Sequence, residues 1–594
     1  MGFRLLALLA LTAGVYFSTL NAPFVYDDYF HIVANTGIHT LTNLRALFHS
    51  GFQETRPIFV LSLALNYFAG GSAPLVYHVT NLVIHLANGL LFLAVLMLVE
   101  SFFPERRNGK IRWVPIGAAS IFLLHPLQTE SVIYINSRSG LLMTSFVLAC
   151  VATFLEFRRS PSIQRSILFY GASLLFEICA LLSKENAVVL PVLLLGADFF
   201  LCPRRTKSSV RSDFKIHAPF WFALAVIPTL YMFFETPHYR TIGLEVMSPR
   251  HHFLTQAGVW VRFLEMYLVP IGQNIDHDFE ITTSLFDPRF LFSFGLLGLL
   301  FGAAVKYYRK LPLFTLGLAW FAVTLSPTNS IVPFRDFMAE RHLYLPLAGL
   351  SLATVVLIEQ LGKRAVGIAA IAWIILLTGM TYARNQVWNS EVSLWQDSVG
   401  KSPQKPRPYL NLGAALADEG RYTEAEVALR HALTLNPTYP EALFNLGFVL
   451  RKSEREREAQ ESLRRLLLLE PHHVDGRTLL AKSLAKDGRL DDAVQLLRDG
   501  YIYPGAFPKC ALLAAQLEIQ AGRSKAAEKT LKDALRRAPA IPPLYMALGR
   551  LYWNEGKKPQ ALSAFHEALS LSGTPAAELE RASHELASLV DQEE

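Results

Sequence analysis

A period of 34 residues in the last third of the chain constrains its fold more than any other feature. One series of small residues with this spacing is Gly413, Gly447, Ala481, Ala515 and Gly549. A second series is Ala425, Ala459, Ala493, Ala527 and Ala561. Two small positions per period are typical of a unit of two helices that cross closely. The period therefore predicts an α-solenoid of five such units.

The repeated unit matches the tetratricopeptide pattern. In the first unit the consensus positions hold Tyr409, Leu412, Gly413, Ala425, Leu429, Ala432 and Pro437. We predict repeats over residues 406–573, a capping helix and tail over 574–594, and a linker over 384–405 that joins the repeats to what precedes them. Such arrays generally bind protein, and the specific hypothesis is a dock for an acceptor protein or another partner.

The preceding residues, 1–383, alternate apolar runs with short basic loops and are predicted to form a polytopic membrane domain, so that the whole chain is all-α. The chain is 52% hydrophobic, which is too apolar for an ordinary soluble protein. About eleven segments approach the length of a membrane span. They are residues 3–20, 77–99, 113–125, 139–157, 167–183, 185–202, 216–234, 290–305, 312–326, 344–358 and 365–382.

The basic residues predict which side of the membrane each loop occupies. They are concentrated in alternate loops, such as 100–112 and 203–215, if the amino terminus is cytoplasmic. Residues 57–70 and 255–272 are interpreted as helices that lie at the interface. An odd number of spans then places the repeats outside the cytoplasm, and a bacterial inner membrane is the expected location. The net charge of +7 is explained by topology, so no nucleic-acid partner is expected.

The predicted outer loops carry the candidate chemistry. The first contains Asp27 and Asp28, a pair of carboxylates that could supply a general base or bind a divalent cation. A solvated turn or a helix cap would explain the pair equally well. The other candidates in these loops are Arg56, His125, Glu130, Lys184, Glu185, Glu340, Arg341 and His342.

Each of these other residues also has a purely structural interpretation. His125 could cap the end of a span, Lys184 and Glu185 could form a local ion pair, and Arg341 could pair with a glutamate. Together, however, acids and cations predicted at one membrane face suit an anionic phosphate group beside a carboxylate base. No nucleotide-binding glycine loop and no serine-hydrolase motif is present in the sequence.

These motifs, in this order, resemble a known family. The motifs are Val25-Tyr26-Asp27-Asp28, Arg56-Pro57, His125-Pro126 with Thr129-Glu130, Lys184-Glu185 and the run Glu340-Arg341-His342-Leu343-Tyr344-Leu345-Pro346. Followed by tetratricopeptide repeats, they are similar to those of the transmembrane-and-tetratricopeptide-repeat O-mannosyltransferases. That family belongs to the multi-spanning C-type glycosyltransferases, and the short repeat array here looks more like a bacterial relative.

The resemblance implies a function and a role for each motif. It implies an enzyme that transfers mannose or another hexose from a polyprenyl-phosphate donor to a hydroxyl, on a protein acceptor, at the outer face of the membrane. Asp27 or Asp28 would be the base, and Arg341, His342, Lys184 and Arg56 would bind the donor phosphate. His125, Glu130, Glu185 and Glu340 would support the site. A divalent cation such as Mg²⁺ or Mn²⁺, held by the two aspartates, stays an open alternative.

Two other functions are compatible with the sequence. A non-catalytic, membrane-anchored scaffold for envelope proteins would need the repeats but not the outer acids and cations. A transporter would place ionisable residues inside its spans, and Glu177 is the residue that favours this alternative.

Overall fold

The computed structural model describes residues 2–39, 41, 55–103, 113–201, 207–233, 247–360, 363–503 and 505–571, and its regular elements there are all helical. This confirms the predicted all-α class. The chain divides into two compact units, residues 1–403 and 404–594, which are described separately. The predicted capping helix and tail, 574–594, lie outside the described residues.

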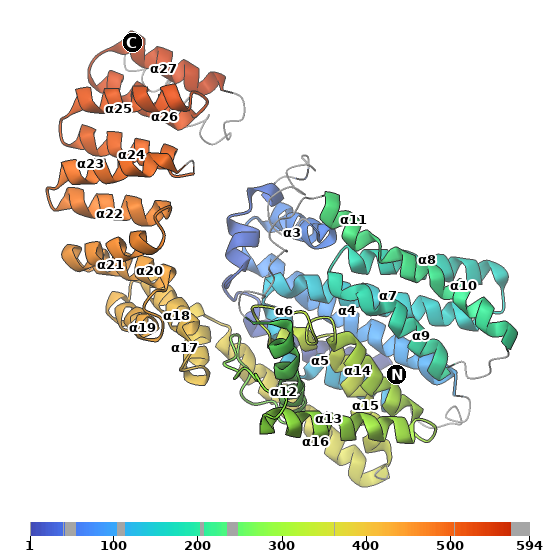
Figure 1. Cartoon of the computed structure of the whole chain (residues 1–594). Coiled ribbons are helices and arrows are strands. Elements are labelled where there is room, and N and C mark those ends of the chain that lie inside the picture. Colours follow the sequence, from blue (N-terminus) through green and yellow to red (C-terminus); the bar gives the residue numbers. More distant parts are fainter. Residues whose placement is uncertain are drawn as a thin grey trace. The chain divides into compact units, whose positions relative to one another are not determined.

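The first unit is a bundle of mostly apolar helices (Figure 1). Its longer helices are α1 (Gly2–Tyr16), α3 (Pro57–Gly70), α4 (Pro74–Ser101), α5 (Trp113–Leu124), α7 (Arg138–Arg159), α8 (Ile163–Leu181), α9 (Leu190–Leu201), α10 (Lys207–Ala223), α11 (Val226–Phe233), α12 (Pro249–Leu268), α13 (Pro288–Tyr307), α14 (Pro312–Leu325), α15 (Pro346–Gln360), α16 (Lys363–Val387) and α17 (Glu391–Lys401). The linker predicted at 384–405 thus contains the end of α16 and all of α17. Proline opens several of these helices, where its fixed φ suits the first turn and its missing N–H leaves no bond unmade.

Several helices of this unit are suited to a membrane. Five helical segments of the described residues are long and apolar enough to cross a bilayer: Gly2–Thr19, Pro74–Ser101, Ile135–Arg159, Ile163–Leu181 and Pro288–Tyr307. Five shorter apolar helices accompany them, among them Pro57–Gly70 and Pro346–Gln360. The membrane character predicted for this part of the chain is confirmed.

Helix α4 carries a buried polar row that holds other segments in place. Asn81 donates to the backbone oxygen of Val132 at 3.0 Å and accepts from Nε of Arg138 at 2.6 Å. Further along the same helix, Nδ1 of His85 lies 2.8 Å from the hydroxyl of Tyr344. Because unpaired polar groups are unfavourable inside a membrane domain, these bonds fix the segments around residues 132 and 344 against α4.

Helices α14 and α15 cross at two glycines. A Cβ added to Gly317 would lie 2.5 Å from the backbone oxygen of Gly349, which is well inside van der Waals contact. Small residues at such a crossing let the two backbones approach closely.

Substitution at this crossing should therefore destabilise the bundle. We expect Gly317→Ala to lower the stability of the membrane unit by roughly 1–3 kcal/mol, the usual effect of overpacking a tight contact. The midpoint of thermal unfolding in detergent measures it. Gly298→Ala on α13 is the matched control, since a Cβ there meets no atom within 4 Å. Equal midpoints for the two variants would contradict the close crossing.

The second unit consists of paired helices, which Figure 1 shows in golden yellow to red. The pairs are α18 (Pro406–Asp418) with α19 (Tyr422–Leu435), α20 (Pro440–Lys452) with α21 (Glu456–Leu469), α22 (Val474–Lys486) with α23 (Leu490–Asp499), α24 (Phe507–Gln520) with α25 (Ser524–Arg537), and α26 (Pro542–Asn554) with α27 (Lys558–Ser570). The predicted small positions lie where the helices of a pair cross. A Cβ on Gly413 would lie 2.6 Å from Cγ of Leu429.

Candidate active site

The segment 130–136 connects the residues predicted for the site. It comprises most of helix α6 (Thr129–Ile133), Tyr134 and the start of a 3-10 turn, η6 (Ile135–Ser137). Glu130, near its beginning, binds Arg341, whereas Tyr134 and Asn136 near its end bind Asp27 and Asp28. Acids and cations more than 300 residues apart in sequence therefore meet on one short stretch of chain.

Asp27 is a half-buried carboxylate held by side chains. The hydroxyl of Tyr134 donates to its Oδ2 at 3.0 Å, and Nδ2 of Asn136 lies 3.5 Å from the same oxygen. Burial and the charges of Asp27 and Asp28 raise the pKa of Tyr134 well above its usual value, so the hydroxyl keeps the proton that it donates. Tyr26 has a positive φ of 56°, which is rare outside glycine and common where a functional residue must be aimed.

Asp28 has a different environment. Its side chain is 1% exposed and accepts hydrogen bonds from the backbone N–H groups of Val25, Ile135 and Asn136 at 3.3, 3.4 and 2.8 Å. Burial raises the pKa of Asp28 to about 8, and these bonds offset only part of that effect. Asp28 therefore ties the first loop to the 130–136 segment and has no open face toward a substrate.

Arg341 is held by two carboxylates. Its Nη1 lies 2.7 Å from Oε1 of Glu130 and its Nη2 lies 3.0 Å from Oδ2 of Asp336. The backbone N–H of Arg341 also donates to Glu130, at 3.1 Å. Burial opposes its charge, but Glu130 and Asp336 raise the pKa of Arg341 further above its already high value. Arg341 lies in η9 (Glu340–Leu343), the turn that precedes α15.

Arg56 and Glu185 form a two-pronged ion pair. The Nε and Nη2 atoms of Arg56 lie 3.0 and 2.6 Å from the two carboxylate oxygens of Glu185. Burial raises the pKa of Glu185, but Arg56 outweighs it and the net pKa is about 2. The pair joins the start of α3 to the start of η7 (Glu185–Val189), the turn that leads into α9.

Lys184 is a cation of this site without a carboxylate partner. Among the residues that the structure describes, none forms a hydrogen bond or an ion pair with its ammonium group. A Cβ on Gly140, one turn after Asn136, would lie 3.8 Å from its Nζ. Burial, with the charge of Arg56, lowers the pKa of Lys184 to about 8. Arg341, Glu130 and Glu185 also act on this pKa, so Lys184 lies among the same charges.

The two predicted histidines differ in their surroundings. Burial and the charges of Arg341 and Lys184 lower the pKa of His342 well below its usual value, so it contributes a neutral ring whose Nδ1 lies 3.2 Å from Oδ1 of Asn329. His125 is buried, and both of its ring nitrogens are occupied, by the backbone N–H of Leu127 and the backbone oxygen of Tyr267. Both contacts of His125 are therefore with the backbone, which agrees with a role in holding the end of α5.

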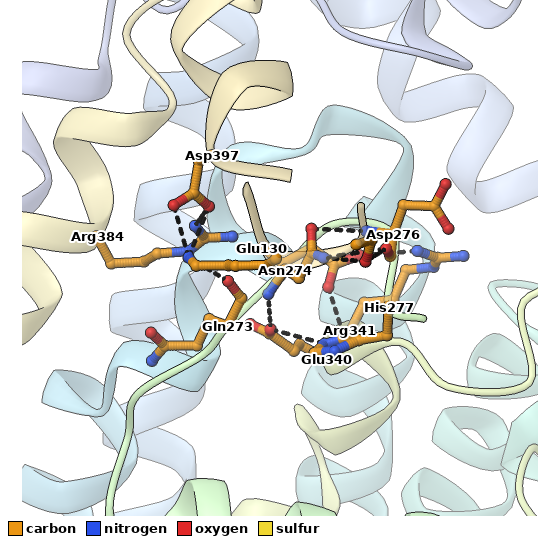
Figure 2. Close-up of polar contacts among 11 residues, drawn as sticks. Glu130, Gln273, Asn274, Asp276, His277, Glu340, Arg341, Arg384 and Asp397 are labelled. Atoms are coloured by element: carbon orange, nitrogen blue, oxygen red, sulfur yellow. Dashed lines mark hydrogen bonds and ion pairs between the residues drawn. The ribbon is translucent and has the colours of Figure 1, made fainter. Parts of the chain in front are cut away.

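Glu340 joins η9 to the segment that contains Asn274 and His277 (Figure 2). Its Oε1 accepts from the backbone N–H of Asn274 at 2.5 Å and lies 3.0 Å from Nε2 of His277. The side chain of Asn274 donates to the hydroxyl of Ser402, just beyond α17. Figure 2 shows this network beside the Glu130–Arg341 pair. Glu340 thus positions the turn that carries Arg341 and His342.

Sequence reasoning missed several residues of this site. Tyr134 and Asn136 hold Asp27, Asp336 is the second partner of Arg341, and Asn274 and His277 bind Glu340. A short, polar Tyr134-Ile135-Asn136 run just before a span was the available signal for the first two. Within the described ranges, no three His, Cys, Asp or Glu side chains form a group that could hold a metal ion.

Comparison with known proteins shows what this chain is similar to. Tetratricopeptide-repeat models match residues 416–483, 475–499 and 512–578. A protein O-mannosyl-transferase of Caenorhabditis elegans is 25% identical over 460 residues, which cover 73% of this chain and 63% of that protein. Protein O-mannosyl-transferase TMTC3 of Homo sapiens is 25% identical over 485 residues, 70% of this chain and 50% of its own length. The chain is a homologue of proteins named protein O-mannosyl-transferase.

The resemblance inferred from the motifs is therefore confirmed. The chain spans about half to two thirds of the length of these relatives. Among solved structures, a tetratricopeptide-repeat protein of Thermus thermophilus is 26% identical, with a TM-score of 0.24 over 31% of this chain and 99% of that one. A crystal structure of MamA protein is 18% identical, with a TM-score of 0.24 over 29% and 94%.

Proposed function

We propose that this chain is an integral-membrane glycosyltransferase that moves mannose or another hexose from a polyprenyl-phosphate donor to a hydroxyl group of a protein. The reaction would take place at the outer face of the membrane, the side on which the repeats would also lie. The observation that carries the proposal is that the 130–136 segment binds a half-buried carboxylate, Asp27, through Tyr134, and a cation, Arg341, through Glu130. Lys184 lies among the charges of Arg341 and Glu130.

The chemistry that we propose is one displacement at the anomeric carbon. Asp27 accepts the proton of the acceptor hydroxyl, whose oxygen forms the new bond to the sugar while the bond to the donor phosphate breaks. The phosphate leaves with that electron pair, and the configuration at the anomeric carbon inverts. Asp27 is better placed than Asp28 to reach the acceptor, because Asp28 is buried and its oxygens face backbone N–H groups.

The leaving phosphate would be stabilised chiefly by Lys184. Arg341 already binds Glu130 and Asp336, and Arg56 already binds Glu185, so their charges are largely balanced. Of these three cations, Lys184 is the one whose charged group pairs with no carboxylate of the described residues. A positive group beside the leaving oxygen lowers the energy of the transition state more than that of the ground state.

The direct test is a transfer assay with the purified full chain. Polyprenyl-phosphate mannose carrying a labelled sugar would be incubated with the protein and with candidate acceptor proteins, and label in the protein fraction would be measured. We expect transfer from the lipid donor and none from a nucleotide sugar. A non-catalytic, membrane-anchored scaffold would give no transfer from either donor.

Lys184 gives this site a defined pH dependence. Its ammonium form binds the phosphate, and with a pKa of about 8 it loses its proton as the pH rises through that value. Donor affinity should therefore be constant well below pH 8 and fall as the pH increases above it. The KM for donor between pH ~6.5 and ~9.5 measures this, because the phosphodiester keeps its charge throughout.

Two variants test whether Lys184 is the group whose titration changes donor affinity. Lys184→Arg should bind donor across the whole range, since a guanidinium stays protonated. Lys184→Met should bind weakly at every pH, and its residual affinity should no longer depend on alkaline pH. A wild-type decline that persists in Lys184→Arg would assign the titration to another group, such as Asp28.

A further inference from the structure

The repeats present one continuous face made by the first helix of each pair. Helix α18 contacts α20, α20 contacts α22, α22 contacts α24 and α24 contacts α26. In a solenoid of helix pairs, a face whose helices touch in this way is the concave one, which can receive an extended chain. The second helices, such as α21, line the opposite side of each layer.

Three cations gather on this face in the second and third repeats. Arg451 and Lys452 lie at the end of α20, and Lys482 lies in the next first helix, α22. Their side chains form no ion pair or hydrogen bond with any residue that the structure describes. The Nε of Arg451 is buried and has no hydrogen-bond partner there, which is unfavourable for a guanidinium. Lys486, on the same helix as Lys482, is already bound to Glu456 at 2.9 Å.

Helix termini alone do not account for this group. Basic residues in the last turn offset the negative end of a helix dipole, and that would explain Arg451 and Lys452. Lys482 lies before the last turn of α22, where this effect has faded. Other cations of the neighbouring helices are paired: Arg430 on α19 and Arg455, just before α21, both bind Glu426 and Glu458.

Aromatic side chains lie between the cations. Phe444 and Phe448 are four residues apart, hence on one side of α20, and both are only partly buried against the core of the repeats. The ammonium group of Lys452 lies 5.6 Å from the ring centre of Phe448. Asn445, beside Phe444, is half-exposed and its side chain forms no hydrogen bond with a described residue, so its amide can bind a peptide backbone.

We propose that this face, defined by Phe444, Phe448, Arg451, Lys452 and Lys482, binds an extended acidic segment of a partner protein. Carboxylates of that segment pair with the three cations, and its apolar side chains cover the two rings. The partner's charge follows from complementarity, because cations on a concave face that pair with no described carboxylate favour an acidic ligand. The inference stands apart from the proposed transfer reaction, and the binding experiment needs no lipid donor.

The experiment uses the full chain in detergent and two labelled peptides. One peptide is rich in Glu and Asp with interspersed Leu, and the other has the same sequence with Gln and Asn in place of the acids. We expect fluorescence anisotropy to report binding of the acidic peptide and at least about tenfold weaker binding of the amide peptide. Raising the salt from ~0.1 to ~0.5 M should weaken the acidic peptide's binding further.

Charge reversal then locates the surface. Arg451→Glu with Lys482→Glu should weaken binding of the acidic peptide by about tenfold or more. The matched control is Arg457→Glu with Arg464→Glu on α21, the second helix of the same layer, where both side chains are exposed. Binding should be unchanged in that control, and circular dichroism should show both proteins folded.

Three outcomes would overturn the proposal. One is equal affinity for the acidic and amide peptides, and another is an equal loss of binding in the control variant. The third is that single-stranded RNA of similar length binds this face more tightly than the acidic peptide does, since that would assign the cations to phosphates. Loss of mannose transfer in the Asp27→Asn variant with unchanged peptide binding would separate the two proposals.

Discussion

Replacing Asp27 with asparagine should reduce hexose transfer by roughly 10²- to 10⁴-fold in kcat, the range expected when a general base is removed. Asparagine has the same shape and can still accept the hydrogen bond that the hydroxyl of Tyr134 donates. Asp27 is proposed to act on the acceptor hydroxyl and not on the donor, so the KM for donor should stay nearly constant. Single-turnover transfer from labelled polyprenyl-phosphate mannose measures the chemical step directly.

Asp28→Asn is the control that distinguishes loss of the base from loss of folded protein. An asparagine at position 28 meets backbone N–H donors on both sides and must turn its own donor toward one of them. The expected effect is a lower midpoint of thermal unfolding, together with loss of activity that follows the loss of folded protein. If Asp27→Asn stays active and Asp28→Asn is folded but inactive, the base has been assigned to the wrong carboxylate.

Replacing Arg341 with alanine should destabilise the membrane unit by about 3–5 kcal/mol, because it leaves a buried carboxylate without its partner. The side chain of Glu130 is 1% exposed and accepts hydrogen bonds from Nη1 and from the backbone N–H of Arg341. Removing the guanidinium also takes away the contact between Arg341 and Asp336, but Asp336 is partly exposed and can be solvated. Thermal unfolding in detergent, with the same lipid content for each variant, measures the difference.

A second substitution distinguishes a broken ion pair from a general loss of packing. In the Arg341→Ala background, Glu130→Gln removes the unpaired charge and should recover a large part of the lost stability, so that the double-mutant cycle is strongly non-additive. Arg421→Ala in the repeats is the control, because its partners Glu419 and Glu424 are exposed to solvent and the unfolding midpoint should not change. Additive effects of the Glu130 and Arg341 substitutions would contradict the pair.

The functional consequence of Arg341→Ala is separable from its effect on stability. Since Arg341 is balanced by two carboxylates, its loss should affect transfer mainly by displacing η9 and with it His342. Lys184→Met should instead weaken donor binding in a fully stable protein. Equal stability losses for the two variants would show that Lys184, too, is part of the structural network.

The sequence by itself determined the class of each part of the chain and most of the candidate residues. A spacing of 34 residues requires a small side chain wherever two helices cross, so Gly413 and its equivalents could be placed without coordinates. The apolar runs likewise determined the membrane character, because a bilayer excludes unpaired polar groups. The order of the motifs was sufficient for the family resemblance.

Only the tertiary structure decided what these residues do to one another. The sequence could not separate Asp27 from Asp28, because the difference lies in which atoms of Tyr134, Ile135 and Asn136 reach each carboxylate. Nor could it show that Glu130 and Asp336 neutralise Arg341 while Lys184 has no described partner. Charge balance and burial depend on contacts between segments far apart in the chain, and local sequence patterns carry no information about such contacts.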